Sequence, residues 1–379
     1  MNDGVRLDLM IGPVVPIPAP QVVMDALTGV EVTTTDTGPT LFQLTFTLAN
    51  RSPLHTLFLL AGGGPVLFLR VIVTVTVNGT PTVLADGVIT DHQVAPGGDE
   101  GHSSLVVTGE DVTVLMDQQD WSGLPFPALP AEGRVALLLA KYAVYGVVPL
   151  IVPSVLVDVP IPTSATPSQQ GTDLAYIRAL ADRVGYVFHV EPGPVPGANI
   201  AYWGPRIKVG VPQPALNADF DADRNVTSLS FRFDSTRNKI PTVFIYNELT
   251  KVVIPIPIPP ITPLNPPLGL VPPLPTSIGD LQPVADNLSK LPIPQAVMIG
   301  LAKAADYADA VTGEGTLDVV RYGRVLRARQ LVGVRGAGPA YDGLHYVTRV
   351  THSLRRGSYT QRFALSRNGL LSTVPEVVP

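Results

Sequence analysis

Proline and glycine interrupt this chain throughout its length. Of its 379 residues, 40 are proline and 34 are glycine. Proline inside a helix removes a hydrogen bond and clashes with the preceding turn, so long helices have little room between these breaks. Many short strands joined by turns fit the same spacing, because glycine and proline favour turns. The sequence therefore predicts a mainly β protein and disfavours helical bundles and coiled coils.

Composition and charge narrow the classes of function. The chain of 379 residues is long enough for two or three domains. Its 45% of hydrophobic residues is enough for a sizeable core. The formal net charge of -5 gives no general reason to bind nucleic acid or an anionic membrane, although a local basic face stays open. Because cysteine is absent, disulfides, thiolate zinc sites, iron–sulfur clusters and thiol nucleophiles are excluded.

The sequence carries no targeting or membrane signal. Asp3 and Asp8 stand where a secretory signal needs an apolar run, so we expect no signal peptide. The apolar stretches 57–77 and 135–157 are broken by glycine, proline and charged residues, so neither predicts a membrane span. If the protein leaves a cell, we expect it to do so inside a particle or by lysis.

Periodicity predicts a first β block at 1–111. Residues 42–50 alternate apolar and polar side chains, which indicates a strand with one buried face. A second alternating run covers 66–78, breaks at Asn78-Gly79 and resumes at Val83, as in a long hairpin. A further strand is predicted at 103–112.

The pattern then changes to a small α/β module at 112–205. An apolar helix is predicted over 131–145, and Thr172 is placed to cap an amphipathic helix with Leu174, Ile177 and Leu180 on its inner face. Strands follow at 185–190 and 200–202, and 160–171 is predicted to be a loop.

A second β block is predicted in two pieces, 206–250 and 315–379, around an insert at 251–314. Thirteen of the 44 residues in 251–294 are proline, which predicts extended, polyproline-like chain without sheet hydrogen bonds. Because the stretch is also apolar, we expect it to lie on a protein surface, of its own subunit ahead of a neighbour. A helix is predicted over 295–311.

Candidate metal sites are weak. The run 219–223 spaces three aspartates as calcium loops do, but it lacks the glycine and the distant glutamate of an EF-hand, so a solvated turn or strand face is preferred. The histidines never pair at the spacing of a helical metal site. They are His55, His92, His102, His189, His345 and His352. We expect neither metal nor cofactor.

Catalytic signals are equally sparse. No nucleophile elbow, phosphate loop or dinucleotide fingerprint is present, and 336–340 is predicted to be a turn. Asp111, Asp117 and Asp120 offer paired carboxylates for glycoside hydrolysis, which keeps a particle-associated hydrolase open as an alternative.

Arginines are predicted to gather on strand faces, where they are either solvated or meet an acidic partner or nucleic acid. Arg327, Arg329 and Arg335 would share one face, and Arg349 and Arg355 another. A monomeric carbohydrate- or protein-binding β module is a third alternative, although the aromatic residues such a surface needs make up only 6% of the chain.

The C-terminal segment 346–369 predicts a hairpin that turns at Gly357. It closely resembles the closing hairpin of baseplate hub proteins of contractile phage tails and contractile injection systems, the late control gene D family. Segments 105–116, 172–190 and 317–343 resemble the same family, and the resemblance covers all but 252–294. The family-like positions are Gly109, Asp111, Tyr322, Gly323, Gly336, Gly338, Tyr346, His352, Gly357, Tyr359, Gln361 and Phe363.

The resemblance implies a homotrimer in which two similar β-barrel domains per subunit form a ring of near six-fold symmetry. Such a ring would adapt a hexameric inner tube to a trimeric spike, with the α/β module and insert around the outside. Its partners would be further copies of itself, inner tube proteins, a separate spike protein and other baseplate components, in a virion tail or injection particle assembled in the bacterial cytoplasm. It implies no enzyme activity.

Overall fold

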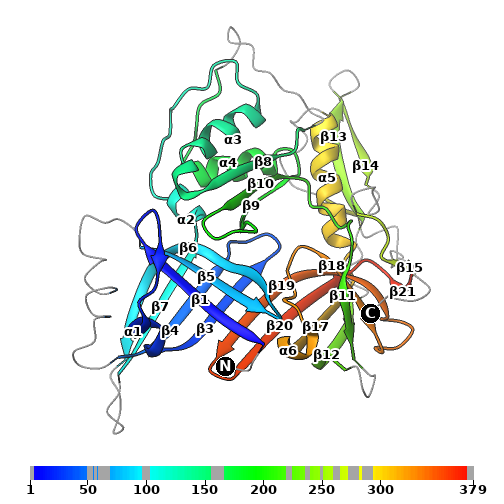
Figure 1. The fold of residues 1–379 in the computed structure, drawn as a ribbon. Coiled ribbons are helices and arrows are strands. Elements are labelled where there is room, and N and C mark those ends of the chain that lie inside the picture. The colour runs from blue at the N-terminus through cyan, green and yellow to red at the C-terminus, as the bar shows by residue number, and fades with distance from the viewer. Residues whose placement is uncertain are drawn as a thin grey trace.

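The structure, a computed structural model, is mainly β, as the proline and glycine spacing predicts. Two β blocks form the lower layer in Figure 1, with a smaller α/β layer above the first and an insert of helix and strands above the second. The described residues are 4–48, 54, 58, 69–95, 103–154, 166–218, 224–234, 240–247, 251–258, 265–271, 281–283 and 293–373.

Five strands of the first block, here called repeat one, pair in antiparallel fashion. Their order across the sheet is β3-β4-β7-β6-β5. The predicted hairpin forms between β5 and β6, where Asn78 and Gly79 both have the positive φ that a tight two-residue turn requires. The strands are β3 (Leu27–Thr35), β4 (Leu41–Leu48), β5 (Arg70–Val77), β6 (Thr80–Ala95) and β7 (Ser103–Asp111).

Five strands of the second block form repeat two, in the order β12-β17-β20-β19-β18. The predicted C-terminal hairpin is confirmed as β19 and β20, which turn at Gly357 with a φ of 83°. The strands are β12 (Val226–Phe233), β17 (Val311–Asp318), β18 (Leu331–Arg335), β19 (Gly343–Arg355) and β20 (Ser358–Arg367). Because β19 also pairs with β3, one sheet runs through both repeats.

One hydrophobic cluster fills both repeats. In β4 the predicted alternation is confirmed, since Phe42, Leu44 and Phe46 are buried. Val350 and Phe363 of repeat two belong to the same cluster. Full burial of such side chains stabilises the fold by about 1.5–3 kcal/mol each. Closed barrels, the domain boundaries and a trimeric ring stay predictions.

The α/β module has a hydrophobic cluster of its own between Val112 and Trp203. Thr172 caps α4 as predicted, because its side chain accepts a hydrogen bond from the Ala175 amide at 3.2 Å. The helix predicted over 131–145 is wrong in its last part: α3 ends at Ala140, and a short 3-10 turn leads to left-handed Gly146. The elements are α2 (Thr113–Met116), α3 (Ala131–Ala140), β8 (Val147–Ile151), α4 (Asp173–Asp182), β9 (Val187–Pro192) and β10 (Asn199–Gly204).

A buried ion pair connects this module to repeat one. The Arg70 guanidinium donates to both carboxylate oxygens of Asp86, at 2.7 and 2.8 Å. It also donates to the carbonyl oxygens of Tyr145 and Gly197, at 2.8 and 3.1 Å. Burial raises the pKa of Asp86, and Arg70 opposes this shift. One arginine thus binds the loops beside β8 and β10 to the sheet.

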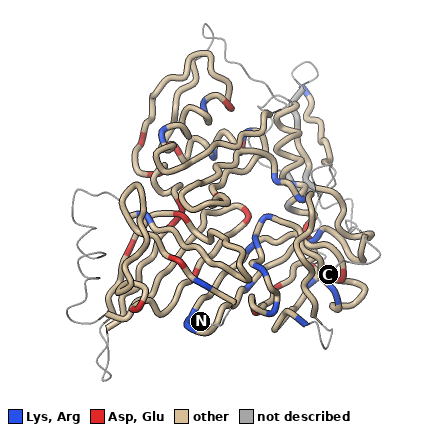
Figure 2. Tube along the Cα trace, viewed as in Figure 1, with Lys and Arg blue, Asp and Glu red and all other residues tan. Residues whose placement is uncertain are grey.

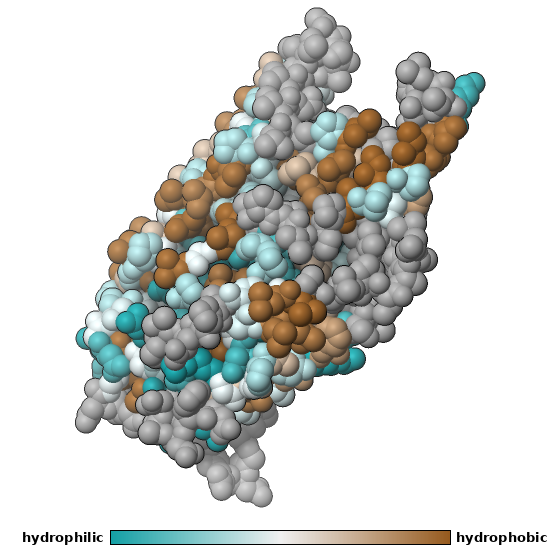
Figure 3. Space-filling model, turned by 90° about the vertical axis from the view of Figure 1, so that its right-hand side faces the viewer, coloured by the Kyte–Doolittle hydropathy of each residue, from teal (hydrophilic) through white to brown (hydrophobic). Residues whose placement is uncertain are grey.

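The insert corrects one prediction. Residues 252–257 are not free of sheet hydrogen bonds, because β14 (Val252–Pro257) pairs antiparallel with β13 (Ile240–Asn247). Pro255 and Pro257 are two residues apart, so both nitrogens face one side of the strand, and an edge strand tolerates proline on its unpaired side. The exposed β14 lies on a side of the molecule where apolar patches alternate with hydrophilic ones (Figure 3).

Packing of the insert on its own chain is confirmed where the structure describes it. Strand β15 (Gly269–Val271) pairs with β21 (Leu370–Ser372), and Leu268 contacts Leu331 and Tyr346 of repeat two. Strand β16 (Leu281–Pro283) lies beside β13. Helix α5 (Ile293–Tyr307) ends before the predicted 311, because Val311 already begins β17.

The remaining elements flank the two repeats. Strand β1 (Val5–Gly12) runs antiparallel beside β5, whereas β11 (Gln213–Asn217) runs parallel beside β18. The others are β2 (Ile17–Pro18), α1 (Gln21–Ala26) and α6 (Val319–Tyr322). None of the helices in the described part of the chain is long and apolar enough to cross a membrane.

Candidate functional site

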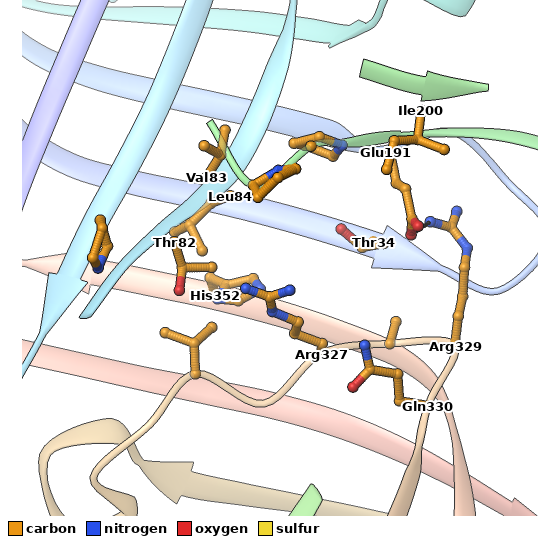
Figure 4. A pocket seen from close by; sticks show the side chains of 16 residues that line it. Thr34, Thr82, Val83, Leu84, Glu191, Ile200, Arg327, Arg329, Gln330 and His352 are labelled. Carbon is orange, nitrogen blue, oxygen red and sulfur yellow. Dashed lines mark hydrogen bonds and ion pairs between the residues drawn. The ribbon is translucent and has the colours of Figure 1, made fainter. Parts of the chain in front are cut away.

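A cavity of about 250 Å³ lies where the two repeats meet the α/β module (Figure 4). Arg327 and Arg329 approach it from the loop before β18, and Glu191 approaches it from β9. Thr34 of β3 and His352 of β19 form part of its wall. Four segments therefore meet at this point, and Arg329 contacts β9 and the turn between β3 and β4.

Arg329 holds this junction together. Its backbone φ is 64° and its side chain is 8% exposed. The guanidinium donates to the Gly38 carbonyl at 3.2 Å and lies 3.5 Å from a Glu191 carboxylate oxygen. Burial lowers the pKa of Arg329, and Glu191 opposes that shift. Arg329 thus connects the β3–β4 turn, β9 and the loop before β18.

The predicted arginine stripe is wrong in part. Arg327 and Arg329 precede β18, and only Arg335 lies in it, because the chain turns at Arg329 before the strand begins. The three do not share a strand face. Arg349 and Arg355 both lie in β19, and Arg349 is 3.5 Å from the exposed carboxylate of Glu314.

Three family-like residues form one buried network in repeat two. His352 Nδ1 lies 2.8 Å from the Tyr359 hydroxyl and 3.2 Å from Gln361 Nε2. Gln361 also donates to and accepts from the Leu326 backbone, at 2.8 and 3.0 Å. Burial lowers the pKa of His352 to about 3, so its ring is neutral at pH 7. In the tautomer with the proton on Nε2, the Nδ1 lone pair is shared between the Tyr359 hydroxyl and the Gln361 amide. The network fixes the loop at Leu326 to β20.

Asp111 lies at the end of the last strand of repeat one, and both of its carboxylate oxygens accept hydrogen bonds there. Its carboxylate accepts from the Thr40 amide at 2.6 Å, and from the Thr113 amide and hydroxyl at 3.0 and 2.6 Å. Burial raises the pKa of Asp111. The side chain therefore joins the end of β7 to the start of β4 and to α2.

The other two candidate carboxylates bind different groups. Asp117 accepts from the Thr172 hydroxyl at 2.6 Å, which ties it to the start of α4. Asp120 accepts from the amide and hydroxyl of Ser122, at 2.7 and 2.6 Å, and these bonds lower its pKa. Each of the three candidate aspartates thus stabilises a separate local turn or strand end.

The remaining family-like residues shape turns and packing. Gly323 ends α6, and the predicted turn at 336–340 is confirmed by the positive φ of Gly336 and Gly338 and by hydrogen bonds to the Gly338 carbonyl. Tyr322 donates to the Pro214 carbonyl at 2.6 Å, and the Lys208 ammonium lies 5.6 Å from the Tyr346 ring centre. Gly109 packs under Phe42, and Phe363 packs over Gly315.

Metal ligation finds no support in the part of the chain that the structure describes, where no three His, Asp or Glu side chains are grouped. His189 and His345 are buried, and burial lowers the pKa of each to about 3. The acidic run 219–223, His55 and His102 lie outside the described residues.

The two repeats have one topology, which sequence reasoning missed in this detail. Numbered by position in the chain, the five strands of each repeat stand in the sheet order first, second, fifth, fourth, third. All four pairings within each repeat are antiparallel. The insert occupies the connection between the first and second strands of repeat two, where repeat one has a short turn.

Both repeats also carry the same two β-bulges. In the first strand, Thr28 of repeat one and Thr227 of repeat two are the extra residues. In the fourth strand, the extra residues are Thr90 and Thr348, and their hydroxyls donate to the opposite strand at 3.4 and 3.2 Å. A bulge fixes register and bend. These four threonines therefore align the two repeats residue by residue, a signal too sparse to find without the pairing.

Charge separates the two repeats. Over 27–48, 69–95 and 103–111, repeat one has one basic residue and six acidic ones. Over 226–234 and 311–367, repeat two has eleven arginines and four acidic residues. Figure 2 shows this concentration of basic residues around repeat two. Contacts between a repeat one and a repeat two are therefore electrostatically favourable.

Comparison with known proteins shows this fold in tail proteins. No family model matches the chain, and no curated protein matches its sequence. A tail protein from Neisseria meningitidis superposes with a TM-score of 0.61 at 14% identity, over 99% of this chain and 100% of that one. A 43 kDa tail protein of prophage MuSo2 from Shewanella oneidensis gives 0.58 at 15% identity, over 96% and 98%.

A chain from a further solved complex shares the fold as well. The VgrG complex of Francisella with PdpA gives a TM-score of 0.58 at 8% identity, over 100% of this chain and 60% of that chain. At these identities the likeness concerns the fold alone. The overall fold is thus shared with two tail proteins and with a chain of a PdpA–VgrG complex.

Proposed function

We propose that this chain is a structural hub of a contractile tail or injection particle, a ring of three copies that adapts a hexameric inner tube to a trimeric spike. The observation that carries the proposal is the duplicated strand repeat. Two equivalent repeats joined edge to edge in one chain give six equivalent units in three chains, which matches a hexameric partner. The family resemblance and the fold shared with tail proteins support the same assignment.

The proposal includes no catalytic step. The carboxylates of Asp111, Asp117 and Asp120 accept hydrogen bonds from separate local donors, and a retaining or inverting glycosidase needs two carboxylates facing one bond. We propose instead that binding to the tube, the spike and other baseplate components is the whole activity, inside a virion tail or injection particle.

The test is the solution mass of the purified chain by light scattering, with negative-stain images of the same sample. The expected mass is three times 40.2 kDa, with a ring that has a central hole. Because the two repeats differ in charge, we expect the trimer to weaken at high salt. A species that stays monomeric, alone and with the spike protein added, contradicts the hub.

A further inference from the structure

We propose that β12 of one copy of this chain pairs, edge to edge, with residues 91–95 of β6 in the next copy. The inference rests on the proposed ring and names the strands and the register that would join neighbouring subunits. It follows from a junction that the chain already forms within itself.

That internal junction connects the two repeats. The first strand of repeat one, β3, pairs with the outer half of the fourth strand of repeat two, β19. The pairing runs from Thr35 opposite Arg349 to Gly29 opposite Arg355. Midway, the hydroxyls of Thr33 and Thr351 lie 3.0 Å apart. A first strand and a fourth strand thus form a continuous antiparallel ladder.

Among the described strands, the first strand of repeat two and the outer part of the fourth strand of repeat one each have a neighbour on one side only. The first strand of repeat two, β12, has only β17 beside it among the described strands. In β6, the fourth strand of repeat one, β5 covers residues 80–88, and the Ile89 amide donates to the Leu69 carbonyl at 3.0 Å. For residues 91–95 the described pairing is with β7 alone. Residues 91–95 are all exposed, and the two edges lie on opposite sides of the sheet (Figure 1). Exposed edges of this kind pair with another chain.

The bulges give the register. Alignment of Thr90 with Thr348 makes Gln93 the counterpart of Thr351. Alignment of Thr28 with Thr227 makes Arg232 the counterpart of Thr33. The internal pair of Thr33 with Thr351 therefore predicts Arg232 opposite Gln93 of the next copy. One step along, Phe231 lies opposite Val94, an apolar pair with Val94 41% exposed in the single chain.

One like-charge pair at this junction has an arginine beside it. Asp91 comes opposite Asp234 at the end of the ladder, where two aspartates repel, and Arg232, 3.9 Å from Asp234 in the single chain, shares their face and offsets that repulsion. Its guanidinium can bind both carboxylates. More widely, the arginine-rich repeat two would meet the acidic repeat one of the next copy, as it does within the chain.

The absence of cysteine makes the register directly testable. In the variant with Gln93→Cys and Arg232→Cys, oxidation is expected to link neighbouring copies and to give covalent dimers and trimers, at two and three times 40.2 kDa, on a denaturing gel. The positive control is Thr33→Cys with Thr351→Cys, which is expected to link within one chain and to leave the mass unchanged. The register control is Gln93→Cys with Phe231→Cys, because Phe231 faces the other side of the strand and gives no link.

The outcomes separate this inference from the proposed function. Trimers that cross-link at Gln93 and Arg232 but not in the register control support both. Trimers by light scattering without that cross-link overturn the strand pairing and leave the ring intact. Cross-linking equal to the register control also overturns the register. Monomers with and without the spike protein overturn the ring and the junction together.

Discussion

Repeat one and repeat two have the same strand order and share two bulges, but they fill their interiors in different ways. In repeat one, Phe42 of the second strand covers Gly109 of the fifth, where an added Cβ would overlap the ring. At the equivalent positions of repeat two the sizes are reversed: Gly313 of the second strand lies opposite Leu365 of the fifth, whose Cβ is 3.4 Å from an added Cβ. At this position each repeat thus places a large side chain opposite a glycine, with the two strands exchanged.

The two repeats also differ in how they hold the layer above them. Repeat one binds the α/β module through Arg70 and Asp86. The bulge alignment places Leu331 and Leu344 at the equivalent positions of repeat two, where Leu331 packs against Leu268 of the insert. Arg70 in repeat one and Leu331 in repeat two thus occupy equivalent places in the sheet and each binds the layer above. Arg70 is polar because it faces backbone carbonyls, and Leu331 is apolar because it faces a leucine. We call them the polar and the apolar anchor.

The largest expected effect comes from giving repeat one the apolar anchor of repeat two. Arg70→Leu leaves Asp86 charged and buried and leaves the Tyr145 carbonyl without this donor. Breaking a buried pair in this way costs about 3–5 kcal/mol of unfolding free energy. Urea denaturation followed by circular dichroism measures the loss.

Asp86→Leu alone and the double variant Arg70→Leu with Asp86→Leu complete a mutant cycle. The double variant is expected to lose less than the sum of the single losses, because neither charge is then left unpaired. If the losses of unfolding free energy in the two single variants simply added in the double variant, Arg70 and Asp86 would not stabilise each other. The matched control is Leu331→Ala in repeat two, which tests the apolar anchor at the equivalent position.

The second prediction exchanges the packing of the two repeats. Gly315→Leu introduces the residue that repeat one has as Leu44, but Phe363 and the Ser228 carbonyl occupy the space. Overpacking of this kind costs about 1–3 kcal/mol, and the backbone contact places this variant at the upper end. Adding Phe363→Val, the counterpart of Val107, is expected to restore part of the loss in thermal unfolding. A double variant less stable than Gly315→Leu would contradict the equivalence of the two cores.

Much of the fold is predictable from periodicity, because alternation at Phe42, Leu44 and Phe46 or at Tyr359 and Phe363 reports a half-buried strand directly. The cap at Thr172 is predictable for a similar local reason. The duplication of the strand repeat is not predictable from the sequence. The residues that align the two repeats are single threonines at bulges, and large and small core residues exchange places between strands. The pairing of β14 is not predictable from proline content, because that content does not show which edge of the strand the proline nitrogens face.

The third prediction concerns acid, to which repeat two is the more sensitive. His345 and His352 are buried there with pKa values lowered to about 3, whereas His92 of repeat one is exposed. Below the ordinary pKa of about 6.5, the unfolded chain binds protons that the folded chain does not, so stability falls as pH falls from 6.5 toward 3. At pH 5 the loss is about 2 kcal/mol for each such histidine.

Urea midpoints at pH 7.5 and pH 5 for the wild type and for His352→Gln measure this effect. The difference between the two pH values is expected to shrink by about 2 kcal/mol in the variant. Asp86 and Asp111 have raised pKa values and act in the opposite direction, but they are common to both proteins and cancel in the comparison. His92→Gln is the control, and an equal change there would refute the assignment to repeat two.

The smallest effect is expected at the bulges that the repeats share. The Thr348 hydroxyl donates to the Ala364 carbonyl at 3.2 Å in a partly buried site, and its counterpart Thr90 makes a longer, exposed contact of 3.4 Å. Thr348→Val is therefore expected to cost about 1 kcal/mol, and Thr90→Val a few tenths, because water replaces the exposed bond. Equal denaturant slopes would show that both variants keep the bulged register. If Thr90→Val lowered the unfolding free energy of the monomer more than Thr348→Val does, the hydroxyl contact would not be what stabilises the bulge.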